Sequence, residues 1–382
     1  MNKSKNIEIQ GLRGYAILIT VAAHFGFLVL PLAPYLEYFW LGGGVDLFFC
    51  ISGFVIARGL FKRREHGFLA FYLPFLIRRL FRLWPAAVFW SVVVLILSIF
   101  FNKSGSFGSF ESNLITAVAS WVQVVNFKMV SCLHYEFAEC SVASPLRIYW
   151  SLSLEEQFYF VFPIFLFFLG NKKVAILAVL LAVVQIFLYR PWPSPLWFFR
   201  TDAICIGVLI AWLHFKGYVE YIDPLFLKSS IYRRFSSVVL CALIFMVAKI
   251  EVVWFFNGLV VLVAGALVYV ASFDNGYFMG RGWLLKGIAY IGERSYSMYL
   301  THMVCLVMTR ELYVRFYGAL PGAGVWPIYL GIFAFVLILI VSEFSYRFIE
   351  CPLRNKGRRL AMAKGQELLS RELKERRSVV SG

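Results

Sequence analysis

Long apolar runs alternate with short polar segments along almost the whole of this 382-residue chain. A spanning helix needs about 20 apolar residues to cross the bilayer core, and somewhat fewer where helices are buried in a bundle. The spacing of the runs therefore predicts an all-α integral membrane protein with about ten transmembrane helices. The predicted spans lie near residues 12–30, 42–60, 83–101, 151–169, 174–189, 203–215, 236–250, 254–271, 288–308 and 327–347. A further apolar segment, 112–126, is interrupted by polar groups, which favours an interfacial helix, with a partial span as the alternative.

Composition and charge favour a membrane protein and argue against a nucleic-acid partner. The chain is 61% hydrophobic and only 15% charged, whereas soluble domains are about a quarter charged. The basic residues behind the net charge of +16 fall at predicted helix ends. With both termini in the cytoplasm, 29 of the 37 Lys and Arg residues lie on the cytoplasmic side, as the positive-inside rule requires. We therefore predict a multi-pass protein with cytoplasmic N- and C-termini, surrounded by membrane lipids.

Two of the segments outside the predicted spans stand out. We predict a membrane domain over residues 1–353 and a basic cytoplasmic tail over 354–382, which would bind the inner leaflet electrostatically. Residues 102–150 form the one long outer loop, and loops of that length often build or cover a site. A disulfide between Cys132 and Cys140 would fit in this loop. The sequence indicates no bound metal, because it lacks HExxH and CxxC spacing, and it leaves the oligomeric state open.

The first predicted span carries two polar side chains, Arg13 and His24. Charged and imidazole groups inside spans are costly and usually mark pathways or catalytic sites. Eleven positions at 100° each end 20° past three full turns, so both side chains project from one face, about 16 Å apart along the axis. The alternative is an arginine that snorkels at the helix end and a histidine that is bonded to a neighbouring helix.

Three more residues extend this set of candidates. His302 lies about fourteen residues into the ninth predicted span, at a depth similar to that of His24, although a packing role would also explain it. Arg79 and Arg82 end the basic inner loop, and their three-residue spacing places them on one helix face. Guanidinium groups bind phosphates well, while topology signalling alone would also account for both arginines.

Acidic residues near the outer ends of the spans are Asp46, Glu155 and Asp202. Arg200 is close enough in the sequence to pair with Asp202. Glu155 opens a predicted helix, where the helix dipole favours negative charge, so a capping role and a functional role both stay open. Carboxylates and aromatic rings at this level would suit a sugar.

These residues favour acyl transfer, with a transporter of a small polar solute as the alternative. A buried, neutral histidine suits the removal of a proton from a sugar hydroxyl, because burial disfavours the charged imidazolium. An arginine cluster on the cytoplasmic side suits a phosphate-bearing donor such as acyl-CoA. The residues alone do not separate the two functions.

Seven motifs, in order along the chain, resemble those of the acyltransferase 3 family. That family comprises the bacterial membrane O-acyltransferases that modify surface polysaccharides, lipopolysaccharide, peptidoglycan and related glycans. The resemblance extends from about Ile7 to Arg354 and is carried by RGYAILITVAAH, GGGVDLFFCISGF, FLIRRLFRLWP, WSLSLEEQFYFVFP, FRTDAICIG, IGERSYSMYLTH and FSYRFIECPLR.

The resemblance implies a function and a location. It implies ten core spans in the bacterial cytoplasmic (inner) membrane. It also implies transfer of an acyl group, most often acetyl, from cytoplasmic acyl-CoA to a hydroxyl of a glycan or lipid-linked sugar, as in O-antigen, capsule or exopolysaccharide. Acyl-CoA is then a donor substrate, and no cofactor is permanently bound. Some relatives carry an additional extracytoplasmic hydrolase-like domain, and the short basic tail of this chain resembles the stand-alone form.

The resemblance also implies roles for individual residues. Arg13 and His24 match the essential arginine–histidine pair of the family, and Glu155 and His302 lie in its recurrent motifs. Arg79 and Arg82 match the family's paired arginines. We therefore predict four catalytic residues and two residues that bind acyl-CoA. The catalytic set is His24, Arg13, Glu155 and His302, and the acyl-CoA set is Arg79 and Arg82.

Overall fold

The fold is known from a computed structural model that describes residues 6–28, 41–62, 67–134, 144–247, 253–319 and 328–381, without the side chains of 26–28 and 375–381. The regular elements within these ranges are all helical. The first half of the described chain holds α1 (Ile7–Leu28), α3 (Gly43–Leu60), α4 (Phe68–Phe100), α5 (Phe110–Trp121), α6 (Val125–His134) and α7 (Tyr149–Ile186). The second half holds α8 (Asp202–Lys216), α9 (Ser230–Met246), α10 (Phe256–Ser272), α11 (Trp283–Glu293), α12 (Ser295–Tyr317), α13 (Ile328–Phe344) and α14 (Cys351–Ser381).

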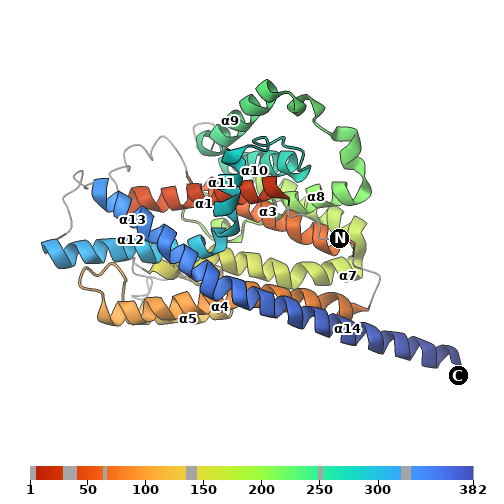
Figure 1. The fold of residues 1–382 in the computed structure, drawn as a ribbon, viewed down its shortest axis with the longest axis horizontal. Coiled ribbons are helices and arrows are strands. Elements are labelled where there is room, and N and C mark those ends of the chain that lie inside the picture. The colour runs from red at the N-terminus through yellow and green to blue at the C-terminus, as the bar shows by residue number, and fades with distance from the viewer. Residues whose placement is uncertain are drawn as a thin grey trace.

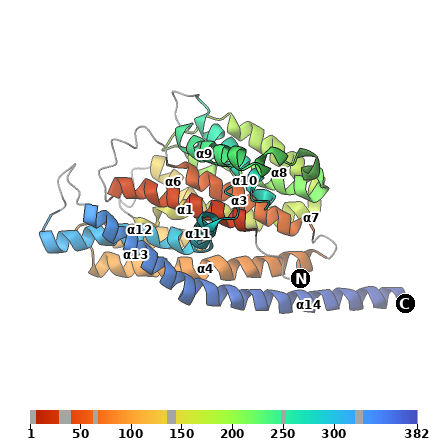
Figure 2. The same cartoon turned by 45° about the horizontal axis from the view of Figure 1, so that its top comes forward.

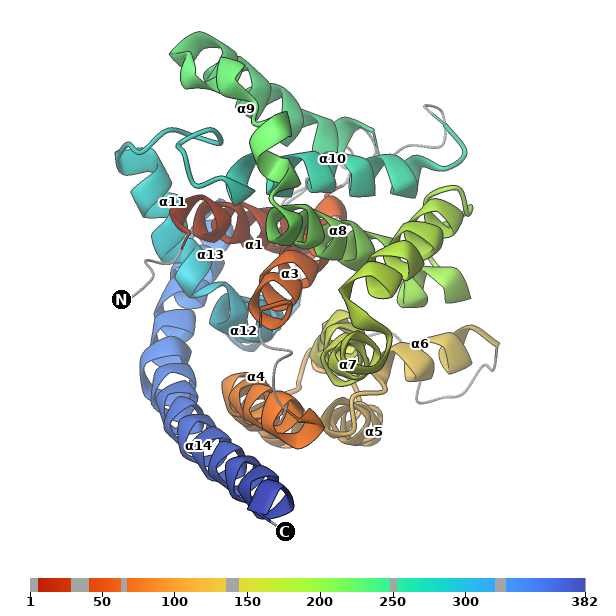
Figure 3. The ribbon, with the colours of Figure 1, turned by 90° about the vertical axis from the view of Figure 1, so that its right-hand side faces the viewer.

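Most of the helices run along the long axis of one bundle (Figure 1). Viewed along that axis, α3 lies near the centre, and it contacts α1, α7, α8 and α10 (Figure 3). We call the end of the bundle that holds the start of α1 and the C-terminus the inner end, and the opposite end the outer end. This arrangement makes α3 the element around which a buried site can be built.

The helices have the length and composition of membrane spans. Within the described residues, five helical segments are long and apolar enough to cross a membrane, and α10 is a shorter apolar helix. The five segments are Gly43–Leu60, Phe68–Phe100, Pro145–Ile186, Pro195–Lys216 and Ile328–Lys374. Helices overlap all ten predicted ranges. The prediction of an all-α, multi-pass membrane protein is therefore confirmed.

Local sequence explains one interruption of the pattern. Gly170 has φ 84° and ψ 165°, a conformation that only glycine adopts easily, and it breaks α7 into two parts. The break falls between the predicted spans 151–169 and 174–189, as expected. Segment 112–126 behaves differently, because α5 runs parallel to α4 rather than across its end (Figures 1 and 3).

Small residues allow α3 and α8 to pack very closely. A Cβ atom added to Gly53 would lie 2.1 Å from the carbonyl oxygen of Ile204, and one added to Gly207 would lie 2.1 Å from that of Cys50. Helices in membranes associate through such contacts because lipid supplies little hydrophobic driving force between them. The close crossing fixes α8, and Asp202 at its start, against the outer half of α3.

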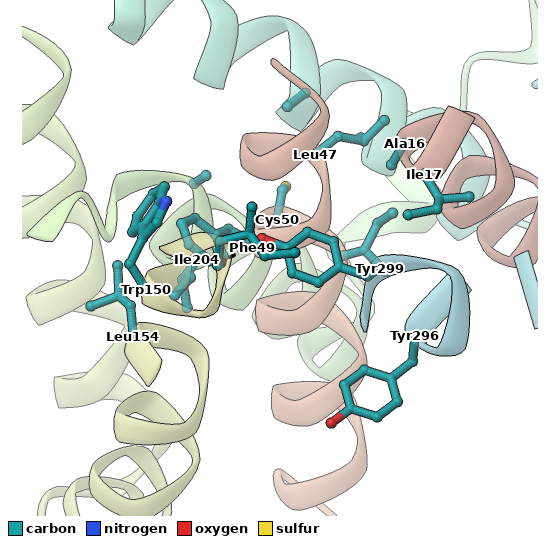
Figure 4. Packing of buried hydrophobic residues seen from close by; sticks show 14 of the residues in the cluster. Ala16, Ile17, Leu47, Phe49, Cys50, Trp150, Leu154, Ile204, Tyr296 and Tyr299 are labelled. Carbon is teal, nitrogen blue, oxygen red and sulfur yellow. Dashed lines mark hydrogen bonds between the residues drawn. The ribbon is translucent and has the colours of Figure 1, made fainter. Parts of the chain in front are cut away.

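The core lies between α1, α3, α7 and α12. Figure 4 shows Leu47, Phe49 and Cys50 of α3 packed between α1 and α7, and all three are almost fully buried. Tyr296 and Tyr299 enter the same region from α12 (Figure 4). The polar groups of the site described below are therefore embedded in apolar packing.

The predicted tail, residues 354–382, is helical as far as it is described, and it continues α13. A π-helical turn, Ser345–Glu350, joins α13 to α14, and the Trp90 indole of α4 donates a hydrogen bond of 2.9 Å to Ser345 in this turn. From there α14 packs along α4 and passes beyond the bundle at the inner end (Figure 2). In the outer loop, Cys132 is disulfide-bonded, and Cys140 lies outside the described residues.

Candidate active site

An inner cavity of about 70 Å³ lies among α1, α3, α4, α7 and α12. Arg13 of α1 and Arg79 and Arg82 of α4 line it. Glu155 of α7 is the one acidic residue among the described residues of its lining. Three guanidinium groups against one carboxylate give this cavity a net positive charge, which suits an anionic ligand.

Arg13 and His24 lie on the same face of α1, as their spacing predicts. Both contact α12: Arg13 Nη2 donates a hydrogen bond of 3.1 Å to Ser295 Oγ, and His24 Nδ1 lies 3.3 Å from His302 Nε2. Arg13 lines the inner cavity, whereas His24 lines a second cavity nearer the outer end. The shared helix face therefore connects two cavities.

Glu155 is held by hydroxyl groups. Its Oε1 accepts hydrogen bonds from Ser52 of α3 and from Tyr159, one turn further along α7. The Arg79 guanidinium lies over the Tyr159 ring, 5.2 Å from its centroid. Because α7 already begins at Tyr149, Glu155 lies in its second turn, so the capping role considered from the sequence is wrong.

The two α4 arginines differ in their surroundings. Arg79 packs between the rings of Phe75 and Tyr159. The buried Nε of Arg82 has no hydrogen-bond partner within the described part of the chain. Arg82 also lines the inner cavity, so its guanidinium group is placed to contact an anionic ligand there.

His24 and His302 form a pair in the middle of the bundle. Their ring centroids lie 5.1 Å apart at an interplanar angle of 54°. His302 is fully buried, while His24 is partly accessible from the outer cavity. The sequence placed these residues at similar depths, and the structure brings them into contact.

Hydrogen-bond partners fix the tautomers of both rings. His302 Nδ1 lies 2.8 Å from the Tyr299 carbonyl oxygen, so Nδ1 carries the proton and Nε2 is the acceptor. His24 Nδ1 lies 2.9 Å from the Thr20 carbonyl oxygen, so it also carries a proton and can share it with His302 Nε2. His24 Nε2 is therefore left with its lone pair, in the form that a base requires.

The outer cavity, of about 550 Å³, is lined by His24 and by residues of the outer loop and of α12. Little separates it from the inner cavity. Tyr299 lines the inner cavity, and its hydroxyl donates a hydrogen bond of 2.8 Å to the carbonyl oxygen of Ile148, which lines the outer one. The same hydroxyl contacts Ser151 at 2.6 Å. The histidine pair and this tyrosine thus lie between the two cavities.

The outer acidic residues form a separate, paired cluster. Arg190 donates hydrogen bonds of 3.0 and 2.5 Å to the two carboxylate oxygens of Asp202. Arg200 lies 3.2 Å from Asp46 and stacks on Trp197 at 3.9 Å. Arg200 and Asp202 are close enough in the sequence to pair, but each forms an ion pair with another residue instead. We call Asp46, Arg190, Arg200 and Asp202 the buried quartet; it does not line either cavity among the lining residues described.

Sequence reasoning missed the hydroxyl groups that hold the site together. Tyr159 had a usable signal, because it lies four residues after Glu155 on one helix face. Ser52, Ser295 and Tyr299 had none, because their partners are distant in the sequence. Serine and tyrosine are too common in apolar helices to be singled out without contacts.

Fold and site together define a class: a helical, multi-pass membrane protein with two internal cavities that meet at a histidine pair. A family model described as an acyltransferase domain matches residues 6–342, nearly the whole chain. The chain belongs to this acyltransferase family, as its motifs predicted.

Curated relatives are similar over most of this chain. Peptidoglycan O-acetyltransferase OatA of Listeria monocytogenes is 28% identical over 371 residues, which cover 92% of this chain and 56% of that protein. O-acetyltransferase OatA of Staphylococcus aureus is also 28% identical over 371 residues, with 91% and 57% covered. A putative O-acetyltransferase of Staphylococcus aureus is 27% identical, with 94% and 60% covered. The chain thus spans little more than half the length of these relatives. No solved structure matches it.

Proposed function

We propose that this protein is a membrane O-acyltransferase. It moves an acyl group, acetyl in our proposal, from acyl-CoA at the inner end to a hydroxyl of a surface glycan at the outer end. One observation carries the proposal: His24 lies on one helix face with Arg13, between a positively charged inner cavity and a larger outer cavity. The names of the relatives support acetyl as the acyl group and make peptidoglycan a candidate acceptor.

We further propose ten spans in the bacterial cytoplasmic membrane, with both termini in the cytoplasm. The distribution of Lys and Arg supports this orientation, because 29 of 37 fall in the segments predicted from the sequence to be cytoplasmic. In this orientation the arginine-lined cavity faces the compartment that contains acyl-CoA, and the outer cavity faces the compartment that contains surface glycans.

The inner cavity is assigned to the donor. Arg79 and Arg82 bind the phosphates of CoA, and Arg13 orients the thioester end. Glu155 lies among these arginines, where its carboxylate offsets their mutual repulsion and sets their spacing. Its hydrogen bonds from Ser52 and Tyr159 fix that carboxylate in place. We therefore assign Glu155 to positioning of the donor site.

His24 is assigned as the general base. Its Nε2 removes the proton of the acceptor hydroxyl, and the oxygen attacks the thioester carbonyl carbon. The carbon–sulfur bond then breaks, and CoA leaves as a thiolate that takes up a proton. In a variant of this scheme, Nε2 first attacks the thioester and carries the acyl group to the acceptor, which ping-pong kinetics would reveal.

His302 is assigned to positioning. It is fully buried and does not line either cavity among the lining residues described, so it acts through His24. Its Nε2 accepts from His24 Nδ1, which holds the ring orientation and stabilises the imidazolium that forms when Nε2 takes a proton.

Replacement of His24 tests the proposal. Purified protein is incubated with labelled acetyl-CoA and a glycan acceptor, and CoA release is measured. The wild-type protein should release CoA in an acceptor-dependent manner, and His24→Ala should lower the rate at least about 100-fold, as the loss of a general base does. The variant should still be expressed, and its thermal unfolding temperature should equal that of the wild-type protein. Uptake of a polar solute without CoA turnover would instead indicate the transporter that the residues alone leave open.

A further inference from the structure

We propose that the outer cavity binds an anionic acceptor glycan, with Arg147 and Arg310 on its acidic group and Trp150 and Trp192 against its sugar rings. This inference rests on the proposed function and narrows it, because it names the class of acceptor. The acidic group is a carboxylate or a phosphate on the glycan, chemistry that a guanidinium recognises in either case.

The lining of the cavity has the chemistry of a sugar site. Two tryptophans, Trp150 and Trp192, line it together with three serines of the outer segments, Ser104, Ser106 and Ser144. Aromatic rings offer flat apolar surface, and hydroxyl groups pair with the hydroxyls of a ligand. The volume of about 550 Å³ lies within the range of small-molecule sites.

The described lining is positively charged. Arg147 and Arg310 line the cavity, and none of the described lining residues is acidic. An acidic group on the ligand would therefore meet an attractive potential in the cavity.

The serine-bearing wall of the cavity is held in place by Glu311. Its buried carboxylate accepts hydrogen bonds of 2.7 Å from the backbone N–H groups of Lys103 and Ser104. Burial alone would raise the pKa of Glu311, but the hydrogen bonds from Ser104, Lys103 and Arg315 lower that pKa overall. The Glu311 carboxyl group is therefore ionised at neutral pH. A site that is fixed before the ligand arrives costs less to occupy.

The position of the catalytic base agrees with this assignment. His24 lines the same cavity as the two arginines and the two tryptophans. Its Nε2 is the unprotonated nitrogen, as the bonds of Nδ1 require. A glycan anchored by its acidic group can therefore present a hydroxyl to the base within one cavity.

The test compares one acceptor with its neutral counterpart. The probe is a tetrasaccharide of alternating glucuronic acid and N-acetylglucosamine, and the control is the same tetrasaccharide with its carboxyl groups reduced to alcohols. Binding of each to the full chain in lipid nanodiscs is measured by calorimetry, without acyl-CoA. The anionic form should bind at least about tenfold more tightly, because a charge-assisted hydrogen bond contributes that much.

Variants then assign the difference to the two arginines. Arg147→Gln and Arg310→Gln should each remove most of the preference, and Arg147→Lys should retain part of it. Lys103→Gln removes an exposed charge beside the cavity and should leave the preference unchanged. A phosphate-bearing tetrasaccharide in a further arm separates phosphate from carboxylate recognition.

The outcomes separate this inference from the proposed function. Equal binding of the two forms, including no binding of either, would overturn the inference, as would an unchanged preference in both glutamine variants. Binding with the expected preference but without acceptor-dependent CoA release would leave the inference standing and overturn the proposed function. Acetyl-CoA affinity should be the same in all variants, because none of these residues lines the inner cavity.

Discussion

Two groups of charged side chains lie inside this bundle, and they are built in opposite ways. The buried quartet has two arginines and two aspartates, all almost inaccessible, and each arginine has its own carboxylate. The inner cavity has three arginines and one glutamate, and all four line an open space. The quartet is balanced by its own ion pairs, whereas the lining of the inner cavity has an excess of arginines over carboxylates.

This difference separates structural from functional charge in an apolar protein. Removing a charged side chain from water costs free energy, and an ion pair with an oppositely charged side chain offsets part of that cost. A buried charge without such a partner can be stabilised by a bound ligand of opposite charge, so it indicates where a ligand binds. Charge inside a span is thus a weak signal by itself, and the balance of charge around a cavity is a stronger one.

The largest effect is expected from breaking the quartet. Asp202→Leu leaves Arg190 buried without its partner and should lower the free energy of unfolding by about 3–5 kcal/mol. Thermal unfolding in detergent measures this loss. The double replacement Arg190→Met with Asp202→Leu should recover most of the stability. If the Asp202→Leu variant had the same free energy of unfolding as the wild-type protein, the quartet would not stabilise the fold.

The next effect is expected in the inner cavity and on binding alone. Arg82→Gln should raise the dissociation constant for acetyl-CoA about 10- to 100-fold, since a charge-assisted contact to phosphate is lost. The thermal unfolding of Arg82→Gln should be unchanged, because Arg82 forms no ion pair within the described residues. Lys62→Gln, at the inner end but outside the cavity lining, is the matched control. Unchanged affinity in Arg82→Gln would place the donor elsewhere.

The histidine pair sharpens the comparison, because it is buried like the quartet but has a reactive member. His302→Phe removes one of the two acceptors of His24 Nδ1–H and leaves the Thr20 carbonyl oxygen, so it should lower kcat about tenfold, the value of one hydrogen bond. The KM for acetyl-CoA should stay constant. His302→Gln keeps an acceptor oxygen and should recover part of the rate and of the wild-type pH profile. Equal loss in both variants would reduce His302 to a packing residue.

The smallest effect is expected where a hydroxyl holds a cavity arginine. Ser295→Ala removes the 3.1 Å hydrogen bond to Arg13 and should raise the KM for acetyl-CoA about threefold, the value of a weak hydrogen bond. Steady-state kinetics at saturating acceptor measure the change. A fall in kcat with constant KM would instead assign Arg13 to the reaction step.

Periodicity predicted those parts of the site that lie on one helix. The three-turn spacing placed Arg13 and His24 on one face, and the three-residue spacing placed Arg79 and Arg82 together. Both pairs are arranged as predicted. Such spacing is set by helix geometry alone, so the sequence contains it.

Contacts between distant helices could not be predicted in the same way. His24 and His302 are separated by 278 residues, and their contact depends on how α1 and α12 pack. The same holds for the exchange of partners in the quartet, where Arg190 rather than Arg200 reaches Asp202. The sequence also left residues 68–82 as part of an inner loop, whereas α4 begins at Phe68 and packs against α14 there. That helix is stabilised by a partner more than 270 residues away.

The most direct test of the central claim uses sealed vesicles that contain the purified protein, with labelled acetyl-CoA on one side and a glycan acceptor on the other. If His24 connects an inner donor cavity with an outer acceptor cavity, label should reach the acceptor across the membrane, and His24→Ala should abolish the transfer while acetyl-CoA still binds. Undiminished transfer by His24→Ala, or acetylation only when donor and acceptor share one side, would contradict the account.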